Sequence, residues 1–164
     1  HVHWKSLQGD TEFLHVLEKM GCKSVEEEDG IKLYPPEERM HGGTFDLSAF
    51  SDQALTLAAI SCFADAPVTI TGIGHIRYQE CDRLHAIVSN LTSLGIACEE
   101  IEEGTICIHP GKPKACEIET FEDHRVAMAF AIPGLVTAGV VIRNPGCCRK
   151  TFEHYFDVLE AAVC

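Results

Sequence analysis

The order of helical and strand-like patterns is the feature of this chain that most restricts its fold. Apolar residues at helical spacing predict helices over residues 11–20, 53–63, 80–94, 123–131 and 151–162. Short β-branched runs predict strands at 44–47, 68–71, 117–119 and 140–143, and hairpins at 22–34 and 97–109. A unit of helix, strand, helix and hairpin recurs after roughly 50 to 70 residues, which predicts an α/β fold with internal repetition.

Two details sharpen this prediction. The segment 53–63 is apolar on nearly every side, so its helix must be buried on most sides. The pair Gly72-x-Gly74 lacks the third glycine of a dinucleotide-binding loop, and no acidic residue follows at the spacing such a loop requires. The pattern therefore argues against a doubly wound nucleotide-binding fold.

Three short strings place cations at or near predicted helix starts. They run over residues 80–83 (Glu-Cys-Asp-Arg), 123–125 (Asp-His-Arg) and 149–152 (Arg-Lys-Thr-Phe). A helix start carries unpaired backbone N–H groups and the positive end of the helix dipole, so an added Arg or Lys favours phosphate or carboxylate binding. Three such sites converging in one fold would suit a small, multiply charged anion.

Composition limits the partners. The 13 Lys and Arg against 25 Asp and Glu give a formal charge of −12, which argues against a nucleic-acid or anionic membrane surface. No apolar run reaches the roughly 18 residues that a membrane span requires. The nine cysteines lack the tight spacing of a disulfide scaffold or a zinc knuckle. We therefore expect reduced thiols, no metal site, and a cytoplasmic protein.

Several strings resemble those of one enzyme family. They are residues 7–10 (Leu-Gln-Gly-Asp), 16–21, 51–56 (Ser-Asp-Gln-Ala-Leu-Thr), 80–84, 120–128 and 150–152, and they follow one another without large gaps. Together they resemble the 3-phosphoshikimate 1-carboxyvinyltransferases, or EPSP synthases. The resemblance implies that residues 1–164 form one partial inside-out α/β domain of repeated βαβαββ units. It further implies the carboxyl-terminal portion of a two-domain enzyme, with the amino-terminal domain absent.

The resemblance also implies a reaction in aromatic amino acid and chorismate biosynthesis. Family enzymes transfer the carboxyvinyl group of phosphoenolpyruvate to the 5-hydroxyl of shikimate 3-phosphate and release phosphate, without a metal or organic cofactor. Asp52 falls on the position of the base that accepts the hydroxyl proton, and Glu80 on that of a second proton-transfer group. Without the resemblance, Ser51 or Asp52 would be read as a helix N-cap, and Glu80 as a first-turn dipole partner.

Arg83, Arg125 and Lys150 fall on the positions that hold the phosphate and carboxylate of phosphoenolpyruvate. Taken singly, each would be read as a surface cation. His124 falls where it would contact substrate or orient Arg125, although a hydrogen bond to the backbone at the helix start explains it equally well. We expect these groups to surround one pocket together with Asp52 and Glu80.

Two substrate-binding positions depart from the family pattern. Gln79 replaces the usual Lys, so we expect weaker substrate binding than in a typical member, and His75 stands where many relatives carry Asn. A UDP-sugar carboxyvinyltransferase of the same fold and a non-catalytic module derived from it remain as alternatives. Because shikimate 3-phosphate rests mainly on the other domain in this family, we expect the chain alone to be inactive.

Overall fold

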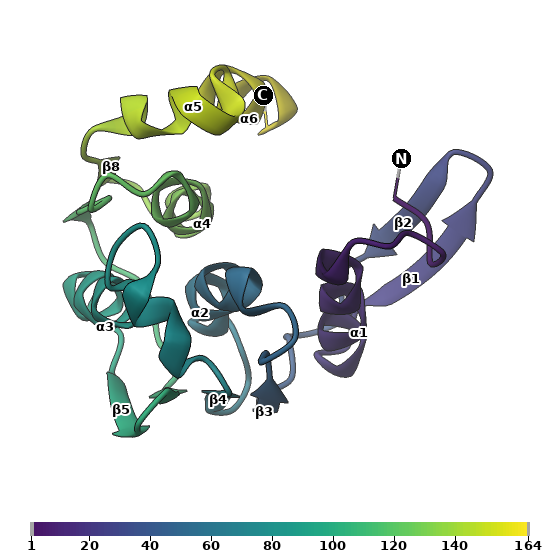
Figure 1. The fold of residues 1–164 in the computed structure, drawn as a ribbon, viewed down its shortest axis with the longest axis horizontal. Coiled ribbons are helices and arrows are strands. Elements are labelled where there is room, and N and C mark those ends of the chain that lie inside the picture. The colour runs from purple at the N-terminus through teal and green to yellow at the C-terminus, as the bar shows by residue number, and fades with distance from the viewer. Residues whose placement is uncertain (1, 164) are drawn as a thin grey trace.

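The computed structural model describes residues 2–163, which form helices and small sheets (Figure 1). The helices are α1 (Glu12–Lys19), α2 (Ala54–Ser61), α3 (Arg83–Ser93), α4 (His124–Gly134), α5 (Arg149–Phe152) and α6 (Tyr155–Val163). Four 3₁₀ turns accompany them, η1 (Gly9–Thr11), η2 (Ser51–Gln53), η3 (Gly74–Tyr78) and η4 (Pro145–Cys148). The strands are β1 (Lys23–Glu27), β2 (Gly30–Tyr34), β3 (Gly43–Asp46), β4 (Val68–Thr71), β5 (Cys98–Glu102), β6 (Thr105–Ile108), β7 (Cys116–Ile118) and β8 (Val140–Ile142).

The predicted repeat is present. Its central copy runs β3-α2-β4-α3-β5-β6, and its four strands form a sheet in the order β3-β4-β6-β5. In this sheet β3 pairs with β4 in parallel, and β6 pairs with β4 and with β5 antiparallel. The segment α1-β1-β2 repeats the last three elements of this copy, and β7-α4-β8 repeats the first three, again with a parallel strand pair. The chain therefore has the mixed α/β architecture that the sequence predicts.

The core lies between the helices and the inner face of the sheets. Helix α2 buries six of its eight residues, and α3 and α4 pack beside it (Figure 1). Val68, Ile70, Ile106 and Ile108 supply the buried face of the four-stranded sheet. The burial expected for the apolar segment 53–63 is confirmed, and the central position of α2 explains why a helix without a polar face is stable here.

Two predicted helix boundaries are wrong. The helix expected over residues 80–94 begins at Arg83, because the Asp82 side chain accepts a hydrogen bond from the N–H of His85 at 2.9 Å and so forms the N-cap. Glu80 therefore lies in the connecting loop rather than in a first helical turn. The helix expected over residues 151–162 is divided into α5 and α6, and α6 has its own start, where the carbonyl of His154 accepts the N–H of Val158.

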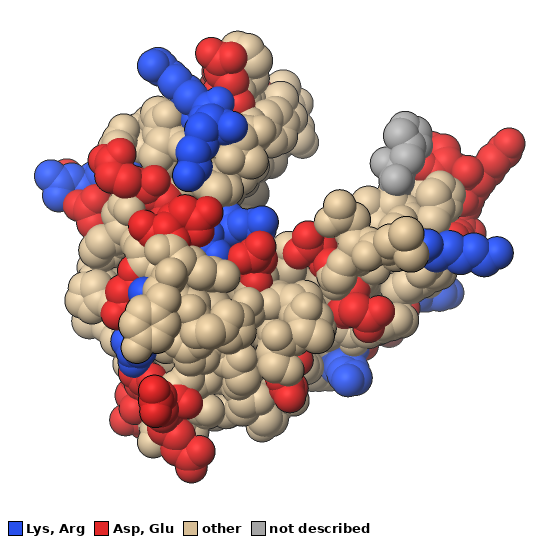
Figure 2. Space-filling view, in the orientation of Figure 1, with Lys and Arg blue, Asp and Glu red and all other residues tan. Residues whose placement is uncertain are grey.

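The two ends of the molecule face each other across a concave surface. The β1-β2 hairpin lies at one end and α5 with α6 at the other, and the central helices lie between them (Figure 1). On this surface, basic and acidic side chains meet where α4 approaches the loop before α3 (Figure 2). Among residues 2–163, no helix has both the length and the apolar character that crossing a bilayer requires.

Candidate functional site

Arg83, the first residue of α3, lies at the centre of a cluster of charged side chains. Its side chain is only 1% exposed. Its Nε donates to Asp123 at 2.7 Å, its Nη1 to Asp52 at 2.9 Å and to Gln79, and its Nη2 to Glu80 at 2.8 Å and to Asp123 at 3.4 Å. These contacts use all the N–H groups of the guanidinium. The alternative in which Arg83, taken singly, is a surface cation is therefore wrong, because three carboxylates and an amide surround it.

Asp123 holds Arg83 in place from inside the protein. Its side chain is fully buried and caps α4 by accepting the backbone N–H of Arg125 at 2.8 Å. Burial alone would raise the pKa of Asp123, but the hydrogen bonds from Arg83 and from the N–H of Arg125 outweigh it, so the pKa lies below its ordinary value. Asp123 therefore remains ionised, and it ties the start of α4 to the start of α3.

Asp52 joins the two arginines. One carboxylate oxygen lies 2.9 Å from Arg83 Nη1, and the other lies 2.8 Å from Arg125 Nη2. Asp52 belongs to η2, and neither η2 nor α2 has a side-chain cap hydrogen bond. The reading of Ser51 or Asp52 as an N-cap is therefore wrong. Ser51 instead pairs with His75, at 2.7 Å between Oγ and Nε2.

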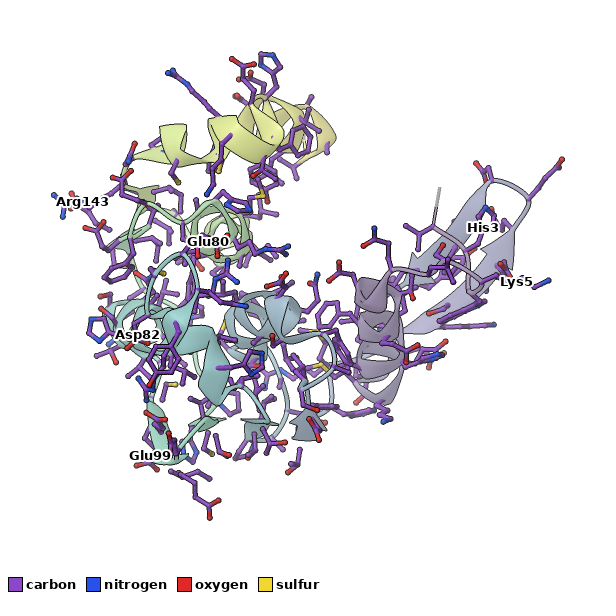
Figure 3. All side chains as sticks on the ribbon, viewed as in Figure 1. His3, Lys5, Glu80, Asp82, Glu99 and Arg143 are labelled. Atoms are coloured by element: carbon purple, nitrogen blue, oxygen red, sulfur yellow. The ribbon has the colours of Figure 1, made fainter. Side chains whose placement is uncertain are left out.

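Gln79 and Glu80 approach Arg83 from the loop between η3 and α3. The Gln79 side-chain oxygen accepts from Arg83 Nη1, and the Glu80 carboxylate accepts from Nη2. In Figure 3, Glu80 lies between its own loop and α4, whereas Glu99 and Arg143 lie on the outer side of the molecule. The loop thus directs both of these candidate residues toward the same guanidinium.

The charges in the cluster nearly cancel. Two guanidinium groups, on Arg83 and Arg125, face the three carboxylates of Asp52, Glu80 and Asp123. The side chains of Asp52 and Glu80 are 37% and 41% exposed, so they can turn into solvent, whereas Asp123 is 0% exposed. An added anion could therefore take the place of Asp52 and Glu80 on the arginines while Asp123 keeps Arg83 oriented.

His124 and Lys150 border this cluster. The ring of His124 is largely buried, and its Nδ1 has no hydrogen-bond partner among the described residues. Burial lowers the pKa of His124, and the charges of Arg125 and Lys150 lower it further against the opposing effect of Asp123. His124 is therefore held neutral. Lys150 is close enough to affect His124, but it forms no ion pair with a carboxylate among residues 2–163.

A small cavity of about 230 Å³ adjoins the cluster. Its lining includes Asp52, Thr56, Arg125 and Tyr155, and the Tyr155 hydroxyl donates to the carbonyl of Met128 at 3.1 Å. A larger hollow of about 570 Å³ lies elsewhere, lined by Phe63, Lys112 and Val136 among others. Of these two cavities of the described residues, the smaller is bordered by the predicted site residues Asp52 and Arg125, so the chemical argument for a site applies to it.

The structure brings Asp52, Gln79, Glu80, Arg83 and Arg125 into direct contact and places His124 beside them. Lys150 is nearby without touching them. The sequence interpretation missed the importance of Asp123, although its position before His124 at a predicted helix start was a usable signal of an N-cap.

The cysteines and possible metal ligands add little to the site. Cys81 Sγ lies 3.6 Å from Asp123, and burial together with that negative charge raises the pKa of its thiol to about 12. The eight cysteines in residues 2–163 are free, as expected for reduced thiols, and Cys164 lies outside the described residues. Among the described residues, no three His, Cys, Asp or Glu side chains group as metal ligands would.

Comparison with known proteins identifies relatives along nearly the whole chain. The sequence model of the EPSP synthase (3-phosphoshikimate 1-carboxyvinyltransferase) family matches residues 1–159. A 3-phosphoshikimate 1-carboxyvinyltransferase of Nostoc punctiforme is 45% identical over 156 residues, which are 95% of this chain and 36% of the relative. The chloroplastic enzyme of the same name in Arabidopsis thaliana is 40% identical over 161 residues, covering 94% of this chain and 31% of the relative.

Solved structures agree on the fold. An EPSP synthase from Acinetobacter baumannii superimposes with a TM-score of 0.78 at 23% identity, covering 94% of this chain and 39% of that one. The enolpyruvyl transferase NikO from Streptomyces tendae gives a TM-score of 0.74 at 19% identity, covering 92% of this chain and 34% of that one. The chain spans about a third of the length of the curated relatives it matches. On the family match and these identities together, the chain belongs to the EPSP synthase family.

Proposed function

We propose that this chain supplies one partial domain of a 3-phosphoshikimate 1-carboxyvinyltransferase. The longer protein would transfer the carboxyvinyl group of phosphoenolpyruvate to the 5-hydroxyl of shikimate 3-phosphate and release phosphate. The observation that carries the proposal is the contact of Asp52 with both Arg83 and Arg125, since it joins a candidate base to two candidate anion-binding groups. The names of the relatives support the same reaction.

In this proposal the two arginines bind the carboxylate and phosphate of phosphoenolpyruvate. A guanidinium binds such groups through paired N–H donors, and burial makes those bonds stronger. Arg83 has its N–H groups engaged, so the substrate must replace Asp52 and Glu80 on its outer side. Asp123 contacts the inner side and keeps the guanidinium plane fixed during this exchange.

The exchange gives Asp52 its proposed catalytic role. Once it leaves Arg83 and Arg125, the Asp52 carboxylate loses two positive partners and becomes a stronger base. It would then accept the proton of the shikimate 5-hydroxyl as the oxygen attacks C2 of phosphoenolpyruvate. Glu80, after leaving Arg83 and taking up a proton from solvent, would give that proton to the methylene carbon and, in the elimination of phosphate, take one back.

Lys150 and His124 would complete the anion site. The free ammonium group of Lys150 would move to the substrate as a point charge, since no carboxylate of the described residues holds it. The neutral ring of His124 would contact the substrate or orient Arg125; because its Nδ1 is buried and lies 3.8 Å from Asp123, Nε2 would make any substrate contact. The other part of the protein would bind shikimate 3-phosphate and close over both ligands. We propose that the chain alone has no activity for this reason.

A hybrid enzyme tests the proposal. In it, this chain replaces the matching segment of the Nostoc punctiforme relative, and phosphate release from phosphoenolpyruvate is measured with shikimate 3-phosphate as acceptor. We expect release by the hybrid and by the intact relative, and none by the 164-residue chain alone. A folded hybrid that binds both substrates but releases no phosphate would refute the proposed reaction. A UDP-sugar acceptor in a parallel assay tests the sister reaction.

Gln79 favours a second candidate, a non-catalytic module of the same fold. Its amide oxygen contacts Arg83, a position from which the Lys usual in the family would contact substrate. A hybrid inactive with Gln79 and also with Gln79→Lys would support this candidate.

We also propose a cytoplasmic location for this protein. Fractionation of the source cells tests it, and the plant relatives are named as chloroplastic.

A further inference from the structure

Arg77 links the loop that carries Gln79 and Glu80 to the rest of the central unit. It lies in η3, and its Nη1 contacts both oxygens of Asp82, at 3.4 and 3.1 Å. Its Nη2 pairs with Glu100 of strand β5. Asp82 is also the N-cap of α3, so Arg77 connects the start of that helix to the β5-β6 hairpin.

The β5-β6 hairpin also contacts the chain at the start of η3. Glu100 accepts the N–H of Gly104 at 3.0 Å, and the carbonyl of Gly104 accepts the N–H of Ile73 at 3.1 Å. A Cβ atom on Gly104 would lie 2.3 Å from the backbone nitrogen of Gly74, and its φ is +72°. This turn therefore requires glycine, because the two backbones approach too closely for any side chain.

Hydrogen bonds and ion pairs hold the chain on both sides of Gln79 and Glu80. Ile73 and Gly74 are held before η3, Arg77 is held within it, and Asp82 is held after the loop. Gln79 and Glu80 lie between Arg77 and Asp82, and both contact Arg83. Their reach toward Arg83 therefore depends on where Arg77 and Asp82 set the loop.

We propose that Arg77, through its pair with Glu100, is a positioning residue that sets the placement of Gln79 and Glu80 in the site. This inference rests on the proposed function. Arg77 does not contact Arg83, Asp52 or Arg125, so it acts through the loop and not on substrate. Small displacements of proton-transfer groups reduce rates strongly, since a shift of about 1 Å can cost on the order of 10²-fold.

An ordinary surface ion pair is the competing explanation. Arg143 with Glu119 is a pair of that kind, with side chains 59% and 45% exposed at 3.1 Å. Arg77 and Glu100 are less exposed, at 28% and 29%. Exposed pairs have little effect when broken, so the two pairs should behave differently.

Arg77→Ala, Arg77→Lys, Glu100→Gln and the control Glu119→Gln are compared in the hybrid enzyme. We expect Arg77→Ala and Glu100→Gln to lower kcat about 10-fold or more, with KM for phosphoenolpyruvate changed less than about threefold. The double variant Arg77→Ala with Glu100→Gln should be no worse than the poorer single variant. Arg77→Lys should recover part of kcat, and Glu119→Gln should match the unchanged hybrid.

Thermal unfolding of the same variants separates positioning from stability. Variants that lose stability but keep kcat at a temperature where they are folded would overturn the inference.

If the unsubstituted hybrid has no activity, the proposed reaction fails, and amide hydrogen exchange of this chain decides the inference by itself. Arg77→Ala should then speed exchange at residues 79–81 about 10-fold relative to Glu119→Gln. Equal exchange in the two variants would show that Arg77 does not set the loop.

Discussion

Replacing Asp52 with Asn should tighten the binding of phosphoenolpyruvate while it removes turnover. In the structure, Asp52 occupies donors of both Arg83 and Arg125, which are the groups proposed to bind the substrate anion. Asn has the same size but no charge, so it competes less for the two guanidinium groups. A residue whose only role was to bind substrate would show the opposite change in affinity.

The magnitude follows from the two contacts. A charged hydrogen bond is worth about 1 kcal/mol more than a neutral one, which applies to the pair with buried Arg83. The side chains of Asp52 and Arg125 are each about one third exposed, so solvent weakens their ion pair. We assign that pair about 0.5 kcal/mol at most. Their total of about 1.5 kcal/mol corresponds to about a 10-fold lower Kd for Asp52→Asn.

Calorimetric titration of the hybrid enzyme with phosphoenolpyruvate at fixed ionic strength measures this change. Glu117→Gln is the matched control, because it removes one negative charge from an exposed carboxylate whose one ion-pair partner among residues 2–163 is Arg143. The control should leave Kd and kcat unchanged. If Asp52→Asn binds phosphoenolpyruvate no tighter than the control does, the anion does not displace Asp52 from the arginines, and the proposed exchange is wrong.

Three other changes have defined outcomes. Gln79→Lys removes an acceptor from Arg83 and adds a positive charge, so KM for phosphoenolpyruvate in the hybrid should fall roughly 10-fold or more, as expected for one charged hydrogen bond; an unchanged KM would contradict the placement of Gln79 at the site. Asp123→Asn leaves the buried Arg83 with one counter-charge fewer, so urea denaturation should show a loss of about 3 kcal/mol in the free energy of unfolding, against less than about 0.5 kcal/mol for Glu117→Gln. The folded pKa of His124 lies below 6.5, so as pH falls through 6.5 the unfolded chain binds a proton before the folded chain does, and stability decreases. His124→Asn should make this decrease shallower between pH 7 and the folded pKa, and equal slopes would show that His124 is not buried as a neutral ring.

Local patterns were sufficient to predict most elements of the fold. The apolar character of 53–63 predicts a buried central helix, and α2 is that helix. The alternation of helices, strands and hairpins predicts the repeat that the sheet β3-β4-β6-β5 confirms. Helix ends were less predictable: the Asp82 side chain begins α3 three residues later than the apolar pattern indicates, which removes Glu80 from the helix.

The sequence by itself determined which elements form and where cations stand at their ends, because those properties depend on neighbours a few residues away. Only the tertiary structure decided that Arg83 is buried among Asp52, Glu80 and Asp123, two of which are 31 and 40 residues away along the chain. The packing of α3 and α4 and the position of η2 bring those charges together, and the contacts of Arg83 with Asp52 and Asp123 have no local sequence signal. Burial then determines that Asp123 stays fixed while Asp52 and Glu80 can move, since only the latter two reach solvent.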